Sequence, residues 1–405
     1  MTRPYLDYAA TTPVDPRVSA LMATLEGPDG VFANPSSDHP AGRAAAQRVA
    51  AAESQVRETL GDPGFRTVWT SGATEADNLA ILGLARALSK RGDARRRMLV
   101  AATEHSAVLA AASAAREYGM QVDTLPVAAD GRLSPQTLAA ALDTDVALVS
   151  LALVNNETGV IQDVPALAPM IRKSGARLHL DAAQALGRLP DASAYGDADL
   201  VSLSAHKCCG PKGIGALCYR PDVRLAPLLH GGGQQAGLRS GTLPVALIAG
   251  MGEALRHLDD VAERQRQRAL QRRLRQALHD LGGVVLNGRD DGAPHILNAS
   301  FPGVHGGALR AALSDLSVGF GSACSRRDGP SHVLRAMGRP DALAYASVRF
   351  SLGRFTTEAD IDTAMATVTD AVTTLRSVSP LWREMSEGRH TVDSAYGVTT
   401  ALEMA

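Results

Sequence analysis

The chain contains 405 residues, and its 41 basic and 42 acidic side chains leave a formal net charge of −1. At about 150 residues per domain this length predicts two to three domains, and the balanced charge argues against a nucleic-acid or anionic-membrane partner. Neither an apolar run of about 18 residues nor a signal-peptide core is present, so we expect a cytoplasmic protein that does not span a membrane.

Short apolar runs alternate with helical patterns between about residues 65 and 220. We expect five strands and three helices there, the strands at 67–70, 98–102, 146–154, 177–180 and 200–203 and the helices at 75–88, 107–118 and 164–173. This alternation predicts an α/β fold with a parallel, doubly wound sheet that has helices on both faces. Ligands bind such sheets beyond the carboxyl ends of the strands.

The turn at residues 70–75 has the composition of a phosphate site. It combines three hydroxyl side chains with the backbone N–H groups of a helix start. Thr74 with Glu75 is equally compatible with a simple helix cap. Residues 239–242 offer further hydroxyl and backbone donors, which is a weaker signal by itself.

Asp181 ends the strand at 177–180, and Lys207 follows the strand at 200–203. Taken alone, Asp181 is compatible with a helix cap and Lys207 with an exposed lysine in a glycine-rich turn. Only four of the 41 basic residues are lysines, however, and arginine cannot lose its proton to become a nucleophile. Pyridoxal phosphate needs both a lysine for a Schiff base and a carboxylate that keeps the ring nitrogen protonated.

The next pattern predicts one long helix over residues 245–281, ended by Gly282 and Gly283. Leucines form one stripe of this helix, and arginines cover the other face. Acidic residues dilute the arginines and no aromatic residues interleave with them, so we interpret that face as solvated. Residues 284–376 return to mixed helices and strands and predict a second, smaller domain.

Cys324 lies in a turn of small residues, ahead of Arg326 and Arg327. Nearby cations favour a thiolate, and a polar loop is an unusual place for an inert cysteine. The chain has four cysteines, too few for a disulfide framework. Cys208 and Cys209 do not have the spacing of a zinc site, and we expect no bound metal.

With these residues in place, the sequence resembles the group I cysteine desulfurases, the NifS/IscS type, within the class V aminotransferases. The similarity extends from residue 6 to about residue 382. It is carried by several motifs in the same order, at residues 6–13, 34–37, 103–105, 154–159, 230–233 and 349–354. The resemblance implies the fold-type I scaffold of pyridoxal-phosphate enzymes. It implies a large domain at residues 15–255 and a small α/β domain, made of 1–14 and 256–405, that carries the Cys324 loop.

The resemblance also implies how pyridoxal 5'-phosphate would be held. Lys207 would bind it covalently, Asp181 would pair with the ring nitrogen, Gln184 would hydrogen-bond the ring hydroxyl and His105 would stack on the ring. The phosphate ligands would be Ala73, Thr74, Ser204 and His206. Thr242 would reach the phosphate of a second subunit, which makes a homodimer the expected active unit.

For the reaction, the resemblance implies that Asn156 lines the cofactor and substrate side and that Arg349 binds the substrate carboxylate as a fork. His105 and Lys207 would transfer protons, and Cys324 would accept sulfur from L-cysteine as a persulfide, leaving L-alanine. The sulfur would pass to acceptor proteins, such as an iron–sulfur scaffold, for iron–sulfur cluster assembly or for thiolation of cofactors or tRNA. The resemblance leaves open a transient iron–sulfur ligand role for Cys324.

Three alternatives stand beside this hypothesis. A selenocysteine lyase would prefer selenocysteine, and another class V aminotransferase or lyase would share Asp181 and Lys207 without using Cys324. A scaffold that has lost catalysis is disfavoured because every candidate catalytic residue is present. The segment after Cys324 is more charged and shorter than in most relatives, so the acceptor of the sulfur stays open.

Overall fold

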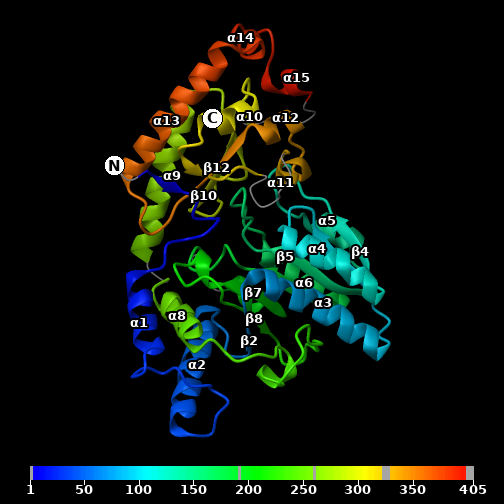
Figure 1. The fold of residues 1–405 in the computed structure, drawn as a ribbon. Coiled ribbons are helices and arrows are strands. Elements are labelled where there is room, and N and C mark those ends of the chain that lie inside the picture. The colour runs from blue at the N-terminus through cyan, green and yellow to red at the C-terminus, as the bar shows by residue number, and fades with distance from the viewer. Residues whose placement is uncertain (1–2, 190–192, 259–260, 322–328, 398–405) are drawn as a thin grey trace.

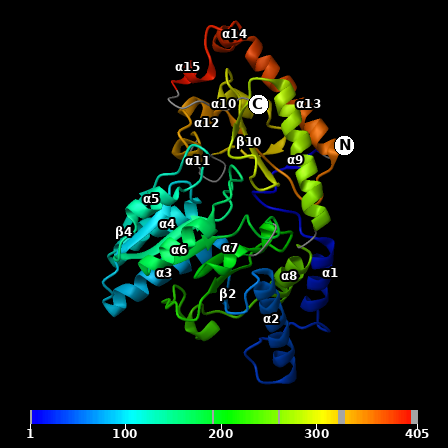
Figure 2. The same cartoon turned by 180° about the vertical axis from the view of Figure 1, so that it is seen from behind.

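The computed structural model describes residues 3–189, 193–258, 261–321 and 329–397. Figure 1 shows a large sheet with helices on both faces and, beyond one end of it, a second group of helices and strands. Figure 2 shows the same arrangement from behind. The fold is therefore α/β, as the sequence predicts.

The large sheet has seven strands in the order β2-β8-β7-β6-β5-β3-β4. Only β8 is antiparallel to its neighbours; the other pairings are parallel. The strand bounds are β2 Arg66–Thr70, β3 Arg97–Ala101, β4 Gln121–Leu125, β5 Val146–Ala152, β6 Arg177–Asp181, β7 Leu200–Ser204 and β8 Gly215–Tyr219. All five predicted strands are present, whereas β4 and β8 were not predicted.

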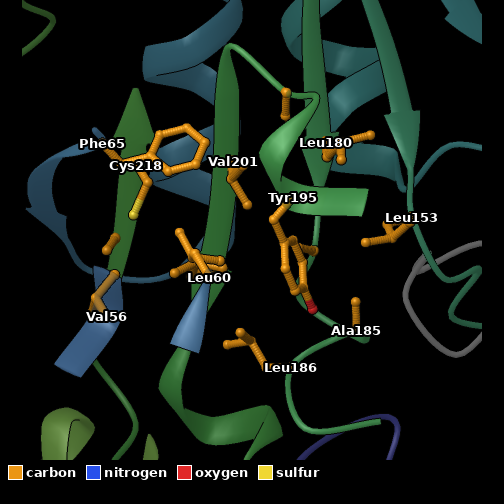
Figure 3. Packing of buried hydrophobic residues seen from close by; sticks show 14 of the residues in the cluster. Val56, Leu60, Phe65, Leu153, Leu180, Ala185, Leu186, Tyr195, Val201 and Cys218 are labelled. Atoms are coloured by element: carbon orange, nitrogen blue, oxygen red, sulfur yellow. The ribbon is translucent and has the colours of Figure 1, made fainter. Parts of the chain in front are cut away.

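Alternate residues of the strands pack into cores on opposite faces of this sheet. In β7, Val201 and Leu203 belong to the core under α1, α2, α6 and α8, while Leu200 belongs to the core under α3 and α4. Figure 3 shows part of the first core, where Leu60 and Tyr195 lie around Val201. The helix bounds are α1 Pro16–Glu26, α2 Pro40–Thr59, α3 Ala73–Arg91, α4 Ser106–Ala115, α5 Pro135–Ala141, α6 Val164–Ser174, α7 Ser193–Gly196 and α8 Val245–Arg256.

Local signals set several helix boundaries. The Ser134 side chain accepts a hydrogen bond from the backbone N–H of Thr137, the third residue of α5, and Thr357 forms a capping box with Asp360 at the start of α13. Gly92 and Gly175 adopt left-handed backbone conformations just after α3 and α6. No helix in the described part of the chain is both long and apolar enough to cross a membrane.

The second group of elements has its own core, built around an antiparallel sheet in the order β12-β10-β9. Near the N-terminus, β1 (Tyr5–Leu6) pairs with β11 (Ser317–Val318), and Leu6 packs into this core. The remaining bounds are α9 Val261–Leu281, β9 Val285–Asn287, β10 Ile296–Ser300, α10 Gly306–Ala312, α11 His332–Ala336, α12 Asp341–Tyr345, β12 Ser347–Ser351, α13 Glu358–Ser377, α14 Pro380–Ser386 and α15 Val392–Tyr396. The exact domain boundaries stay a prediction.

The single helix predicted over residues 245–281 is wrong. The chain forms two helices, and His257 after α8 has left the helical range. The predicted leucine stripe serves two cores, because Leu255 packs under the large sheet whereas Leu270 and Leu274 pack under the second one. The direction of the chain changes between these cores, so tertiary packing overrides the continuous periodicity.

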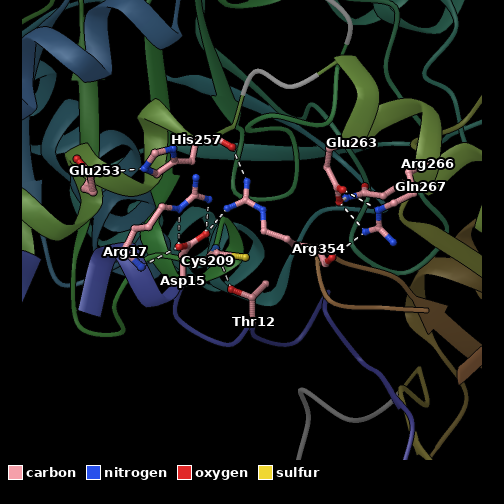
Figure 4. Close-up of polar contacts among 10 residues, drawn as sticks. All are labelled: Thr12, Asp15, Arg17, Cys209, Glu253, His257, Glu263, Arg266, Gln267 and Arg354. Carbon is pink, nitrogen blue, oxygen red and sulfur yellow. Dashed lines mark hydrogen bonds and ion pairs between the residues drawn. The ribbon is translucent and has the colours of Figure 1, made fainter. Parts of the chain in front are cut away.

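Asp15 lies where the two cores meet (Figure 4). Its carboxylate is 3% exposed and accepts hydrogen bonds from Arg17 and Arg354. Arg354 also donates to the carbonyl of His257, and Arg266 of α9 donates to the carbonyl of Arg354. These contacts tie the start of α1 and the turn after α8 to the chain that follows β12. The hydrogen bonds, first that from Arg17, lower the pKa of the Asp15 carboxyl.

Replacing Asp15 by Asn should destabilise the protein at pH 7 by about 2 kcal/mol, because it leaves the partly buried Arg354 charge without its partner. Since the folded-state pKa is lowered, the stabilisation is complete above the unfolded-state value of about 3.9 and is lost as the pH falls toward the folded-state value. The free energy of unfolding in urea should therefore differ less between Asp15→Asn and the natural protein at pH 3 than at pH 7.

Asp341→Asn is the matched control. Arg335 donates two hydrogen bonds to Asp341, but this pair is exposed. The substitution should change the stability very little. Equal losses in the two variants, or an Asp15→Asn deficit that does not narrow at pH 3, would contradict the role of Asp15.

Candidate active site

A cavity of about 460 Å³ lies at the carboxyl ends of β5, β6 and β7. Parallel strands place these ends at one edge of the sheet, where the sequence predicts the site. The lining also includes a residue of β12, so both cores contribute. Ten predicted site residues line the cavity, namely Ala73, Thr74, His105, Asn156, Asp181, Gln184, Ser204, His206, Lys207 and Arg349.

Lys207 ends the short helix that follows β7 (η2, Ala205–Lys207). Its side chain is partly buried, and Nζ donates to the carbonyl oxygens of Ala9 at 2.5 Å and Ala10 at 2.8 Å. Lys212 also lines the cavity but is exposed. Of these two lysines, Lys207 is the one whose amine the fold holds inside the cavity.

Asp181 is the last residue of β6 and is 6% exposed. Its Oδ1 accepts a hydrogen bond of 2.9 Å from the backbone N–H of Ala183, so it does cap the following turn. Burial raises the pKa of the carboxyl, while this hydrogen bond and the positive charges of His105 and Lys207 oppose the rise. A cationic group bound in the cavity would stabilise the ionised carboxylate.

Residues near the N-terminus form part of the same cavity. The carbonyl oxygen of Ala9 accepts hydrogen bonds from both Lys207 Nζ and Gln184 Nε2, the latter at 2.8 Å. Thr11 Oγ1 lies 3.1 Å from His206 Nδ1. No role for Ala9 or Thr11 was predicted; the motif at residues 6–13 was the available signal.

The start of α3 and the end of β7 bring unpaired hydrogen-bonding groups together. Gly72 precedes α3 with a φ of 154°, and no side chain caps this helix start. Ser204 Oγ is buried and has no hydrogen-bond partner among the described residues. A helix cap with Thr74 and Glu75 was the alternative prediction for this turn. Glu75 does accept a hydrogen bond of 2.7 Å there, from the backbone N–H of Ser71 ahead of the helix. This end of the cavity has the donors that an anion needs.

His105 caps the start of α4. Its Nδ1 accepts a 3.1 Å hydrogen bond from the backbone N–H of Ala107, so the neutral ring carries its proton on Nε2. Burial lowers the pKa of His105, and the negative charge of Asp181 opposes that effect. The fold therefore favours a neutral imidazole beside Asp181.

Arg349 of β12 also lines the cavity, and its side chain is 6% exposed. Nη2 pairs with Asp7 Oδ1 at 2.6 Å, and Nη1 donates to the carbonyl oxygen of Asn156 at 2.9 Å. The pairing with Asp7 was not foreseen.

Two further buried acids lie near Asp181. Glu104 accepts from the backbone N–H of Ala152, and neither carboxylate oxygen of Asp77 has a hydrogen bond within the described ranges. Burial raises the pKa of both carboxyls. His179 hydrogen-bonds two serine side chains, and burial lowers its pKa to about 3, so it is neutral. Glu104 lies within the motif at residues 103–105, whereas Asp77 and His179 carry no visible signal in the sequence.

Thr242 is exposed and does not line the cavity, whereas the predicted sulfur acceptor Cys324 lies outside the described residues. Near residues 322–328, Ser331 donates a hydrogen bond to Glu157, and a β-carbon on Gly321 would lie 2.5 Å from Ser331 Cβ and 3.1 Å from Glu157 Oε2. Glu157 directly follows Asn156.

The described cysteines are Cys208, Cys209 and Cys218, and all three are buried. Burial raises the pKa of Cys208 and of Cys218 to about 12, so their thiolates do not form at neutral pH. Cys208 Sγ donates to the carbonyl oxygen of Ala205 at 3.1 Å. No cluster of three or more metal-ligating side chains is found in the part of the chain that the structure describes.

Comparisons with known proteins agree with this geometry. A model of the aminotransferase class-V family matches residues 4–363. Cysteine desulfurase IscS of Serratia proteamaculans is 46% identical over 391 residues, which cover 95% of this chain and 96% of that protein. IscS of Escherichia coli O9:H4 has the same identity and coverage.

Solved structures give the same result. A NifS-like protein superposes with a TM-score of 0.83 at 32% identity, over 92% of this chain and 100% of that one. DndA from Streptomyces lividans has a TM-score of 0.71 at 39% identity, over 86% and 99% of the two chains. The chain therefore belongs to the class-V aminotransferase family and, within it, to the cysteine desulfurases.

Proposed function

We propose that this chain is a pyridoxal-phosphate-dependent cysteine desulfurase, which converts L-cysteine to L-alanine and leaves the sulfur on Cys324 as a persulfide. The observation that supports it most is the arrangement within one cavity. Its lining combines a lysine amine, a buried carboxylate, anion-binding donors at the start of α3 and an arginine. Membership of the family adds support for the cofactor.

The residues present fit this cofactor. The uncapped start of α3 and the unpartnered Ser204 hydroxyl supply donors for a phosphate, with Ala73, Thr74 and His206 beside them. Asp181 would pair with the ring nitrogen, whose positive charge offsets the desolvation of the carboxylate. Gln184 would donate one amide N–H to the ring hydroxyl, because the carbonyl oxygen of Ala9 accepts a hydrogen bond from the other.

Lys207 would hold the cofactor covalently, and His105 would stack against it. When bound, pyridoxal phosphate withdraws electrons from the substrate's α-carbon, so that the α-proton can leave. The Lys207 amine is then the base that removes this proton and returns it. His105 carries its exchangeable proton on Nε2 and can pass it to the substrate side of the cavity.

Arg349 would bind the carboxylate of L-cysteine, with Asn156 beside it, and would fix the substrate's orientation. The Cys324 thiolate attacks the substrate sulfur and forms a sulfur–sulfur bond. The carbon–sulfur bond breaks, its electron pair stays on the β-carbon, and that carbon takes up a proton to give alanine. No outside oxidant or reductant is required for this step.

The comparisons favour this activity over a selenocysteine lyase or another class V aminotransferase. A related solved structure is that of SspA in complex with cysteine, which agrees with the proposed substrate. We further propose a homodimer in which Thr242 of one subunit reaches the phosphate site of the other. A sulfur-acceptor protein such as an iron–sulfur scaffold and a cytoplasmic location remain predictions from the sequence.

The covalent role of Lys207 can be tested by borohydride reduction of the protein with its cofactor, followed by peptide mass spectrometry. We expect the label on Lys207, because its amine lies inside the cavity. Lys207→Ala should abolish alanine formation, whereas Lys212→Ala should leave kcat within about threefold, since Lys212 is exposed. A label on Lys212, or an active Lys207→Ala variant, would show that the assignment is wrong.

The sulfur acceptor can be identified by mass spectrometry of the protein after treatment with L-cysteine. We expect a sulfur adduct of about 32 Da on Cys324 in the natural protein and none in Cys324→Ser, because a hydroxyl cannot accept sulfur. Cys218→Ser is the control, since that thiol is buried and protonated. An adduct on Cys208, Cys209 or Cys218 in place of Cys324 would overturn the mechanism.

A further inference from the structure

Ala9 and Thr11 of the N-terminal segment, residues 7–12, line the cavity, and the proposed mechanism gives this segment no catalytic role. Through Ala9 and Thr11 it contacts Lys207, Gln184 and His206 on the cofactor side of the cavity. Its first residue, Asp7, is not a lining residue of the cavity but forms an ion pair of 2.6 Å with Arg349, which is one. The segment is itself fixed, because its backbone donates two hydrogen bonds to Ser351 of β12.

The Arg349 guanidinium is held on three sides. Asp7 accepts from Nη2, the carbonyl oxygen of Asn156 accepts from Nη1, and the backbone of Gly319 covers the Nε edge. A β-carbon on Gly319 would lie 2.6 Å from Nε, which leaves no space there for a ligand. Nε is buried and has no hydrogen bond to a described residue.

An arginine side chain has five N–H groups, one on Nε and two on each terminal nitrogen. Because the Nε edge is covered, a carboxylate cannot use the Nε and Nη2 pair. Asn156 and Asp7 each take one N–H from the terminal nitrogens. One N–H therefore remains on Nη1 and one on Nη2, and we take these two as the end-on fork that would bind a carboxylate.

We propose that Asp7 is a positioning residue that fixes the Arg349 guanidinium so that this end-on fork faces the substrate carboxylate. The inference rests on the proposed function, because it assumes that Arg349 binds the carboxylate of L-cysteine. Asp7 acts through Arg349 and takes no part in the chemistry. Without Asp7 the guanidinium keeps one hydrogen bond, to Asn156, and can rotate away from the binding orientation.

The expected signature is a change in KM with little change in kcat, because substrate binding is affected and bond breaking is not. Asp7→Ala should raise the KM for L-cysteine at least about fivefold and change kcat less than about threefold. Asp7→Asn keeps an oxygen that accepts from Nη2, so its KM should stay within about threefold of the natural value. If Asp7 had a purely structural role, the two variants would not differ in KM while their kcat values stayed similar.

Asp315→Ala is the matched control. Asp315 pairs with Arg3 at 2.9 Å, next to the same N-terminal chain, but both side chains are more than two-thirds exposed. Its KM should be unchanged. All variants are assayed with saturating pyridoxal phosphate, by alanine formation from L-cysteine with a reductant present. If Asp7→Ala does not fold, Asp7→Ser takes the place of that variant in the test, because it removes the same carboxylate.

A smaller rise in KM for Asp7→Ala, an equal rise in Asp7→Asn, or a loss that falls mainly on kcat would overturn the positioning role. The proposed function fails separately, if the natural protein forms no alanine from L-cysteine. An active natural protein with an unchanged Asp7→Ala variant rejects this inference alone.

Discussion

The carbonyl oxygen of Ala9 is the point on which the arrangement of the site depends. It accepts from the Lys207 amine and from the Gln184 amide, which come from the carboxyl edge of the large sheet. The same residue donates its N–H to Ser351 of β12. One residue thus connects both cores to the cavity, and the Lys207 amine obtains backbone acceptors inside a partly buried site.

Burial then determines the protonation states around this point. It favours a neutral His105 and raises the pKa of Asp181 and Glu104. The cavity is therefore electrostatically complementary to a cationic ring beside Asp181 and to anionic groups at the start of α3 and at Arg349. This charge distribution matches a phosphate-bearing cofactor and an amino acid with a carboxylate, which is the chemistry that we propose.

Much of the site was predictable because parallel strands with polar residues at their carboxyl ends bring those residues to one edge. Asp181 and Lys207 are in this class, and the motif order identified the family. The break between α8 and α9 was not predictable, because the leucine stripe continues through it and only the two cores reveal the change. The role of Asp7 was also hidden, since its partner Arg349 lies 342 residues away. Cys324 stays a sequence-based assignment.

The proposed chemistry is tested most directly by a single-turnover measurement on the purified protein with bound pyridoxal phosphate, given excess L-cysteine but no reductant and no acceptor protein. We predict a burst of about one alanine per subunit, after which the reaction stops because Cys324 holds the sulfur. Continued alanine formation at the initial rate, or formation of a product other than alanine, would contradict the proposed function.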